Sequence, residues 1–128
     1  MMKRCFAAIA LVLTASIGVA QQVSVPSGLD IALYDVILEP ANQTARFRFL
    51  APQIGIENGA TFTDVVPDLQ YLCDKIVVPG LAENGWTDGD VVISLSASEV
   101  EFGVASPEVV QYFQPFSIQA GACMWEDF

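Results

Sequence analysis

The side chains with the clearest chemical potential in this sequence are carboxylates, because histidine is absent. Without histidine a Ser/His/Asp or Cys/His nucleophile arrangement cannot be built, and the commonest metal ligand is missing. Two pairs of carboxylates stand two positions apart, Asp88 with Asp90 and Glu99 with Glu101. Residues at this spacing on a strand share a face, so either pair could act as acid and base in a carboxylate-dependent hydrolase. Acidic turns are common, so the spacing is weak evidence and the sequence favours a non-enzymatic protein.

The segment 83–90 (ENGWTDGD) is the best candidate for a ligand-binding loop, because it gathers oxygen donors and glycines. Glu83, Asp88 and Asp90 could offer carboxylate oxygens to calcium, and Trp86 could stack on a small ligand. The segment lacks both the D-x-[DN]-x-[DN]-G pattern and the closing glutamate of a calcium loop. A calcium- or small-ligand-binding module is therefore an alternative function, and packing is the more ordinary role of Trp86 and Trp125.

The N-terminal segment has the layout of a secretory signal peptide. Lys3 and Arg4 precede an uncharged run, Cys5 to Ala20, which is shorter than the roughly 20 residues of a membrane span. Small residues at the end of this run suit a signal peptidase. We expect residues 1–20 to be a signal peptide that is cleaved between Ala20 and Gln21. A retained membrane anchor is the alternative.

Cleavage would leave two cysteines, Cys73 and Cys123, which stand 50 positions apart. Two cysteines in an oxidising compartment predict one disulfide. The chain-entropy model gives such a bridge about 4 kcal/mol of stabilisation as an upper figure. Two separate buried thiols, as in a cytosolic protein, are the alternative. With no histidine and two cysteines a zinc site is disfavoured, and we expect neither a metal nor a cofactor.

The net negative charge of the chain limits the classes of partner that it can bind. Loss of Lys3 and Arg4 with the signal peptide would change the formal charge from −10 to −12, because all 15 acidic residues follow position 20. Such a surface disfavours nucleic acids and anionic membranes, whose phosphates require lysine and arginine. It is compatible with a basic partner, with cations or with simple solubility. Residues 21–128 are of a length that predicts one domain.

The central element is a predicted amphipathic helix from Asp64 to Val77. Its apolar residues recur every three or four positions, which is the spacing of a buried helical stripe: Val65, Leu69, Leu72, Cys73, Ile76 and Val77. Asp64 is the expected N-cap, and Pro67 is tolerable if it lies in the first turn. Pro79 disfavours helical geometry at the preceding residue, so we expect the helix to end near Val77.

A hairpin of residues 31–39 and 45–50 is expected before this helix. Leu38 opposite Phe47 is the expected register, which places Glu39 opposite Arg46 and puts apolar side chains on one face. The other face carries Arg46 and Arg48. Exposed ion pairs of this kind contribute at most about 1 kcal/mol. A solvated, paired face is the more ordinary interpretation of the arginines, and an anion site is the alternative.

The C-terminal half predicts further alternating elements. Residues 90–96 and 100–104 alternate between apolar and polar side chains and are expected to form a second hairpin. A short helix is expected from Ser106, ended by Pro115. Extended segments 116–118 and 122–125 follow, with Gly121 marking a turn or bulge between them. The predicted order ββαββαβ gives an α+β domain, in which two helices cover one face of an antiparallel sheet of about five strands.

Three stretches from Tyr71 onward carry a resemblance to a known family: LCDKIVVPGLA, VVISLSASEVEFGVASPEVVQYFQPF and CMWEDF. They resemble a family of small exported proteins of unknown function from marine alphaproteobacteria. Some relatives carry the label acetolactate synthase. Such enzymes are several times longer and use thiamine diphosphate, and their Gly-Asp-Gly…Asn-Asn signature is absent here. The resemblance therefore implies export and no particular activity.

These patterns together predict a small acidic domain that is exported to the periplasm or secreted. We expect it to be non-enzymatic, and to bind a partner or support the cell envelope. The calcium- or small-ligand-binding module is the alternative, and a hydrolase is less favoured. The partner is an unknown protein or small molecule, not a nucleic acid, and no stable membrane insertion is expected after signal removal.

Overall fold

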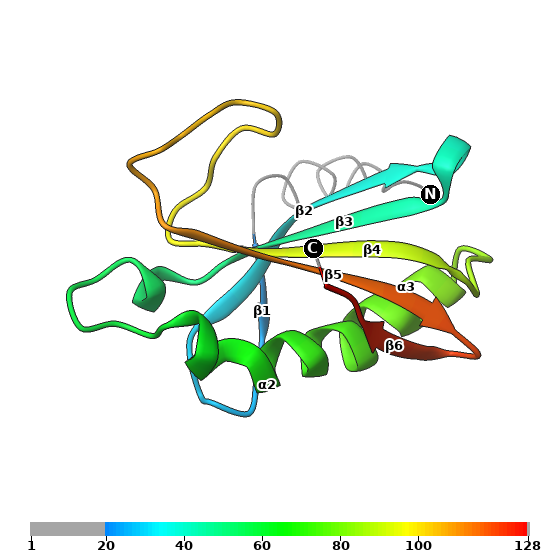
Figure 1. Cartoon of the computed structure of the whole chain (residues 1–128), viewed down its shortest axis with the longest axis horizontal. Helices are drawn as coiled ribbons and strands as arrows, with labels where there is room; N and C mark the ends of the chain where they lie inside the picture. The colour runs from blue at the N-terminus through cyan, green and yellow to red at the C-terminus, as the bar shows by residue number, and fades with distance from the viewer. Residues whose placement is uncertain (1–19, 128) are drawn as a thin grey trace, which may run out of the picture.

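A mixed sheet, whose strands lie side by side in the order of the chain, forms the frame of the protein (Figure 1). The computed structural model describes residues 20–127, so the predicted signal segment up to residue 19 lies outside the described residues. The six strands are β1 (Gln21–Val23), β2 (Ile31–Glu39), β3 (Thr44–Leu50), β4 (Gly89–Ser96), β5 (Gln111–Gln119) and β6 (Ala122–Trp125). Short 3-10 turns, η2 (Pro40–Asn42) and η3 (Pro52–Ile54), flank β3.

One pair of neighbouring strands is parallel, and the remaining pairs are antiparallel. β3 runs parallel to β4, with Phe47 opposite Ile93. Parallel neighbours need a crossover connection, and the helical segment between β3 and β4 provides it. The α+β single domain is confirmed, whereas the expectation of about five antiparallel strands and two separate helices is wrong.

A single helical segment runs without a break from Phe62 to Ala82, as α2 (Phe62–Leu72), a π turn η4 (Cys73–Val77) and α3 (Val78–Ala82). It begins at Thr61, whose side chain accepts a hydrogen bond from the Asp64 N–H at 3.2 Å. The Asp64 carboxylate accepts one from the Thr61 N–H at 2.9 Å. The predicted N-cap was wrong because this reciprocal capping box begins three residues earlier. Pro67 accordingly lies inside α2 and not in its first turn.

The expected stop near Val77 was also wrong. The Val78 N–H donates to the Cys73 carbonyl five residues back, which is the wider spacing of a π turn. In a regular α-helix the ring of Pro79 would meet the carbonyl four residues before it. The π turn immediately before this proline changes the local hydrogen-bond spacing, and the helical segment continues to Ala82.

The hairpin of β2 and β3 is present, but its register is two residues from the predicted one. Val36 lies opposite Phe47, and Leu38 lies opposite Ala45. A shift of two keeps each side chain from Asp35 to Glu39 on its face, so alternation alone could not distinguish these registers. A bulge between Leu33 and Asp35 changes the register before that point and places Leu33 opposite Phe49. Glu39 lies opposite Thr44 and still reaches Arg46 diagonally, at 3.4 Å from carboxylate to Nε.

The second predicted hairpin and the helix at Ser106 are both absent from the described residues. Residues 97–110 form a loop, in which the Val109 N–H donates to the Ser106 carbonyl as an isolated turn. β4 pairs instead with β5, and Pro115 lies within β5 opposite Val92. Buried and more exposed side chains alternate along β5 on both sides of Pro115. This proline therefore lies within a strand and does not end a helix. The expected turn at Gly121 is confirmed, since Ala120 and Gly121 both have positive φ between β5 and β6.

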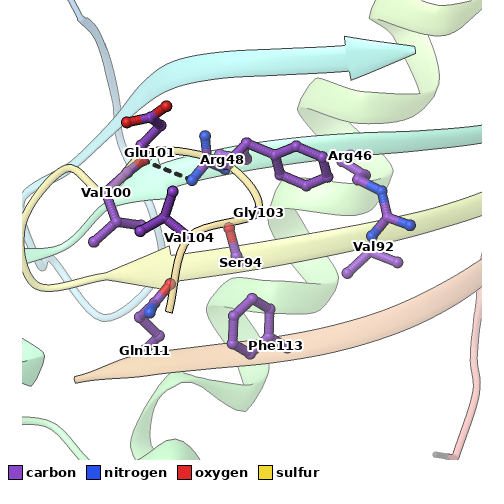
Figure 2. A pocket seen from close by; sticks show the side chains of 11 residues that line it. Arg46, Arg48, Val92, Ser94, Val100, Glu101, Gly103, Val104, Gln111 and Phe113 are labelled. Carbon is purple, nitrogen blue, oxygen red and sulfur yellow. Dashed lines mark hydrogen bonds between the residues drawn. The ribbon is translucent and has the colours of Figure 1, made fainter. Parts of the chain in front are cut away.

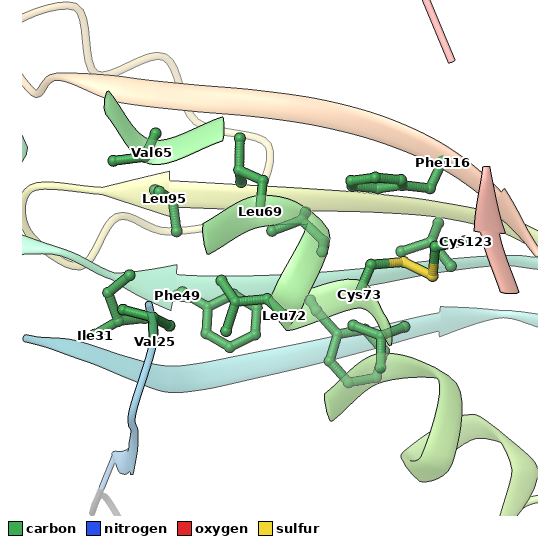
Figure 3. Close-up of a cluster of buried hydrophobic side chains, with 14 of the residues drawn as sticks. Val25, Ile31, Phe49, Val65, Leu69, Leu72, Cys73, Leu95, Phe116 and Cys123 are labelled. Atoms are coloured by element: carbon green, nitrogen blue, oxygen red, sulfur yellow. A yellow bond between two sulfur atoms is a disulfide. The ribbon is translucent and has the colours of Figure 1, made fainter. Parts of the chain in front are cut away.

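The hydrophobic core lies between the helical segment and one face of the sheet (Figure 3). Its largest side chains with almost no exposed surface include Phe49, Leu69, Leu72, Leu95 and Phe116. The predicted disulfide is present and joins Cys73 on the helix to Cys123 on β6, with Cα atoms 6.1 Å apart. No helix in the described part of the chain is long and apolar enough to cross a membrane.

Candidate functional site

A cavity of about 160 Å³ lies on the face of the sheet that is turned away from the helix, beneath the loop 97–110 (Figure 2). Its residues come from three adjacent strands and from the loop above them: Arg46 and Arg48 of β3, Val92 and Ser94 of β4, Gln111 and Phe113 of β5, and Val100 to Val104. The loop supplies the roof, and the sheet supplies the floor.

The alternation of the strands explains why these side chains gather. Phe47 and Phe49 of β3 are buried in the core beside the helix. The intervening Arg46 and Arg48 therefore point to the opposite face. Across the ladder Arg48 lies opposite Ser94, which in turn lies opposite Phe113, so the polar and aromatic side chains share one floor.

Arg48 holds the loop onto the sheet and is 8% exposed. Its Nη1 lies 2.6 Å from the carboxylate of Asp35 on β2. Its Nη2 donates a 2.8 Å hydrogen bond to the carbonyl of Val100 in the loop. The guanidinium carbon also lies 5.2 Å from the ring centre of Tyr34 and 5.4 Å from that of Phe102. These partners occupy both ends of the guanidinium, so Arg48 has a structural role.

Arg46 is differently placed, because its side chain is one-third exposed (33%) and only loosely paired. Its Nε lies 3.4 Å from the Glu39 carboxylate, and its guanidinium carbon lies 5.6 Å from the ring centre of Phe102. Among the described residues no hydrogen bond is made by its two terminal nitrogens. A guanidinium with free, forked donors can bind a carboxylate with two parallel hydrogen bonds.

Positive charge is scarce in this protein and is concentrated at the cavity. The described residues contain three cationic side chains, Arg46, Arg48 and Lys75, and two of them line this cavity. Asp35 and Glu39 balance the formal charge of the two arginines, and the carboxylate of Glu101 also lines the cavity. Both arginines are paired with carboxylates, as the sequence suggested, but a loop covers this face of the sheet. The guanidinium N–H donors that remain unused belong to Arg46.

Apolar side chains surround the cavity and are exposed to solvent. Phe102 and Val104 of the loop are 47% and 51% exposed, and Phe113 of β5 is 45% exposed. We call Phe102, Val104 and Phe113 the apolar rim. Grouped exposed apolar residues of this kind are typical of interaction sites.

The residues singled out in the segment 83–90 do not converge on one site. Trp86 and Asp88 line a second hollow, described below, whereas Glu83 and Asp90 are not among its lining residues. Within residues 20–127 no group of three carboxylate or cysteine side chains is arranged to hold a metal ion. The predicted loop therefore brings one of its three carboxylates to a concave surface.

The carboxylate pairs considered for catalysis are likewise separated. Glu99 and Glu101 lie in the loop 97–110, not on a strand, so the expectation that they share a face does not apply. Glu101 lines the cavity and Glu99 does not.

The predicted signal cleavage site lies at the start of the described residues. Ala20 directly precedes β1, which Gln21 begins. Cleavage between them stays a prediction.

Sequence reasoning missed the cavity because it expected residues 100–104 to form a strand. A usable signal was present in the two arginines, which stand two positions apart on a strand in a chain with few other cations. That spacing places both on one face. The aromatic residue near both guanidiniums, Phe102, comes from a loop more than 50 positions away, and no local sequence pattern predicts its position.

Comparisons with known proteins give one match. A model described as a family of unknown function (DUF6497) covers residues 7–128. No curated protein and no solved structure matches the chain.

Proposed function

Because the chain belongs to the family of unknown function DUF6497, we propose its function from the chemistry of the cavity. It is an exported, non-enzymatic binding domain that holds a segment of a partner protein beneath the loop 97–110. The segment has an acidic side chain next to a large apolar one. The observation that carries this proposal is the pair of unpaired guanidinium nitrogens of Arg46 at a cavity that exposed apolar side chains flank.

The volume of the cavity limits what can enter it. About 160 Å³ is close to the roughly 150 Å³ that accommodates one benzene ring in an apolar protein cavity. It is below the range of about 300–1,000 Å³ that is usual for drug-sized ligands. One apolar side chain of a partner fits this space better than a cofactor or a sugar does.

The charge at the cavity selects the neighbour of that side chain. Arg46 can pair with a carboxylate because its terminal nitrogens are free and its side chain is accessible. Arg48 is already bound to Asp35 and Val100, so it keeps the loop in position. An acidic residue beside the apolar one satisfies Arg46 without disturbing the loop.

The apolar rim favours a protein over a free small molecule. Phe102, Val104 and Phe113 are each about half exposed, so a ligand of one ring would leave much of their surface uncovered. A polypeptide that crosses the loop would cover them. Aromatic residues and arginine are also the residues that contribute most at protein interfaces.

The proposals that the protein is exported and that it is not an enzyme are supported by different observations. The predicted leader and the bridge between Cys73 and Cys123 support an oxidising compartment, the periplasm or the exterior. The absence of histidine and the separation of the paired carboxylates support a binding role over a hydrolase.

The test is a titration of the disulfide-bonded protein with capped tetrapeptides centred on Glu-Phe. Binding is monitored through the NMR chemical shifts of the backbone amides. We expect saturable shifts in residues 97–113, and about tenfold weaker binding of the matched Gln-Phe peptide, which lacks the charge. The Glu-Ala peptide should also bind more weakly. Equal binding of all three peptides, or shifts elsewhere on the surface, would contradict the proposal. Equal binding of free phenylacetate would replace the protein segment with a small carboxylate.

A further inference from the structure

A second hollow lies at the C-terminal end of the helical segment, between α3 and the turn that joins β5 to β6. Its volume is about 450 Å³, within the range of small-ligand sites. Three segments line it: Val78 and Ala82 of α3, Trp86 to Asp88 of the following loop, and Ile118, Ala120 and Gly121. We propose that this groove binds a small organic cation of the alkylammonium class, with the Trp86 ring against the cation and Asp88 as its counter-ion.

The fold holds the tryptophan in place. The backbone N–H of Trp86 donates to the carbonyl of Leu81 at 2.9 Å, which anchors the loop to the end of α3. Gly85 precedes it with φ of +81°, a conformation that favours glycine. One side of the indole packs against the hydrophobic core, and Trp86 is also a lining residue of the groove. The ring is therefore a fixed wall and not a mobile surface side chain.

The tight turn between β5 and β6 forms another part of the lining. Ala120 and Gly121 occupy the two turn positions with positive φ, and both line the groove. A Cβ at Gly121 would meet no atom within 4 Å, so this side is open space. Val78, Ala82 and Ile118 complete an apolar surface for alkyl groups.

The chemistry of the lining selects an organic cation. Tryptophan is the best aromatic partner for a cation, and alkylammonium groups are recognised by such faces. Asp88 is exposed and makes no hydrogen bond or ion pair to another described residue, so its charge is available. A calcium ion needs six to eight oxygen ligands, which one carboxylate and one threonine hydroxyl cannot supply. An alkylammonium ion needs one counter-charge and apolar contact.

The charge of the whole chain acts in the same direction. Three cationic side chains occur among residues 20–127, and none of them lines this groove. The formal charge of −10 raises the local concentration of cations near the surface. The two hollows therefore differ in their lining, since both arginines line the first one and no cationic side chain of the described residues lines the second.

Fluorescence of Trp86 tests this inference directly. In a Trp125→Phe background Trp86 is the remaining tryptophan, since the sequence has two. The probes are choline and its uncharged carbon isostere, 3,3-dimethylbutan-1-ol. We expect a saturable change with choline and at least about fivefold weaker binding of the isostere, because the cation–π and ionic contacts are lost.

Matched variants separate the charge from the shape of the groove. Asp88→Asn should weaken choline binding about fivefold, whereas Asp90→Asn should leave it unchanged, because Asp90 does not line the groove. Circular dichroism of each variant confirms that the fold is retained. Equal binding of choline and the isostere, no effect of Asp88→Asn, a response to calcium matching that to choline, or no saturable response would overturn the inference.

Discussion

The carboxylate of Asp74 on the helix accepts a hydrogen bond of 3.1 Å from the backbone N–H of Cys123 on β6. One helical turn earlier, Gln70 donates from its side-chain amide to the carbonyl of Cys123 at 3.0 Å and to Asp74 at 3.1 Å. Cys123 is thus held by its backbone as well as by its disulfide. β6 is an edge strand, and this clasp satisfies edge groups that would otherwise be open to another chain.

The disulfide should contribute to global stability by restricting the unfolded chain. We expect the double variant Cys73→Ser/Cys123→Ser to lose about 2–4 kcal/mol of unfolding free energy, measured by urea denaturation. Both sulfurs are buried, so the reduced wild type should behave similarly. An unchanged unfolding midpoint after complete reduction would show that the bridge does not stabilise the fold.

The clasp between Asp74 and Cys123 should be visible in hydrogen exchange. Asp74→Ala removes the acceptor of the Cys123 N–H, which should raise the exchange rate of that amide about tenfold, equivalent to about 1.4 kcal/mol. The neighbouring Lys75→Ala is the control, because Lys75 is exposed and makes no hydrogen bond among the described residues. The same exchange rate in both variants would remove Asp74 from this role.

The capping box predicts a specific dependence on pH. Hydrogen bonds from the Thr61 backbone and side chain lower the pKa of Asp64 below its ordinary value of 3.8. The folded state therefore favours the charged form, and the resulting stabilisation is complete above the unfolded pKa. It disappears as the pH falls through the lower, folded-state pKa.

The measurement for this cap is the difference in unfolding free energy between wild type and Asp64→Asn. We expect wild type to be more stable at neutral pH and the difference to shrink towards about pH 2. Glu57→Gln serves as the control, since Glu57 is exposed and makes no side-chain hydrogen bond among the described residues. A difference that does not change with pH would contradict the assignment of Asp64 to the cap.

The two arginines should separate stability from binding. Arg48→Leu removes an ion pair and the hydrogen bond that holds Val100, so we expect a loss of about 2 kcal/mol in unfolding free energy. Arg46→Gln removes an exposed pair and should change stability by less than about 1 kcal/mol. Thermal unfolding of both variants checks this order, and equal losses would mean that Arg46 is also structural.

The alternation of apolar residues was sufficient to predict β2, β3 and the buried stripe of the helix, but not the short strand β1. It could not fix the register, because Leu38 opposite Ala45 and Leu38 opposite Phe47 give the same faces. The cysteines were paired correctly because the predicted leader left two of them. What local patterns supply is the face of each residue.

The remaining features depend on contacts between distant segments. Asp68 lies outside the apolar stripe that the spacing predicts, yet it is fully buried and accepts hydrogen bonds from the N–H and hydroxyl of Ser27, 41 positions away. The loop 97–110 similarly depends on Arg48 and not on its own alternation. A polar residue whose partner is remote in the chain has no periodic signal, so the loop that covers the cavity could not be predicted, although the spacing of the two arginines marked the face beneath it.

The most direct test of the binding role is one titration carried out on two proteins. The capped Glu-Phe and Gln-Phe peptides are titrated into wild type and into Arg46→Gln, and the amide shifts of residues 97–113 give four dissociation constants. We predict that wild type prefers Glu-Phe about tenfold and that Arg46→Gln binds both peptides equally and weakly. An undiminished preference for Glu-Phe in Arg46→Gln, or no preference in wild type, would contradict the account.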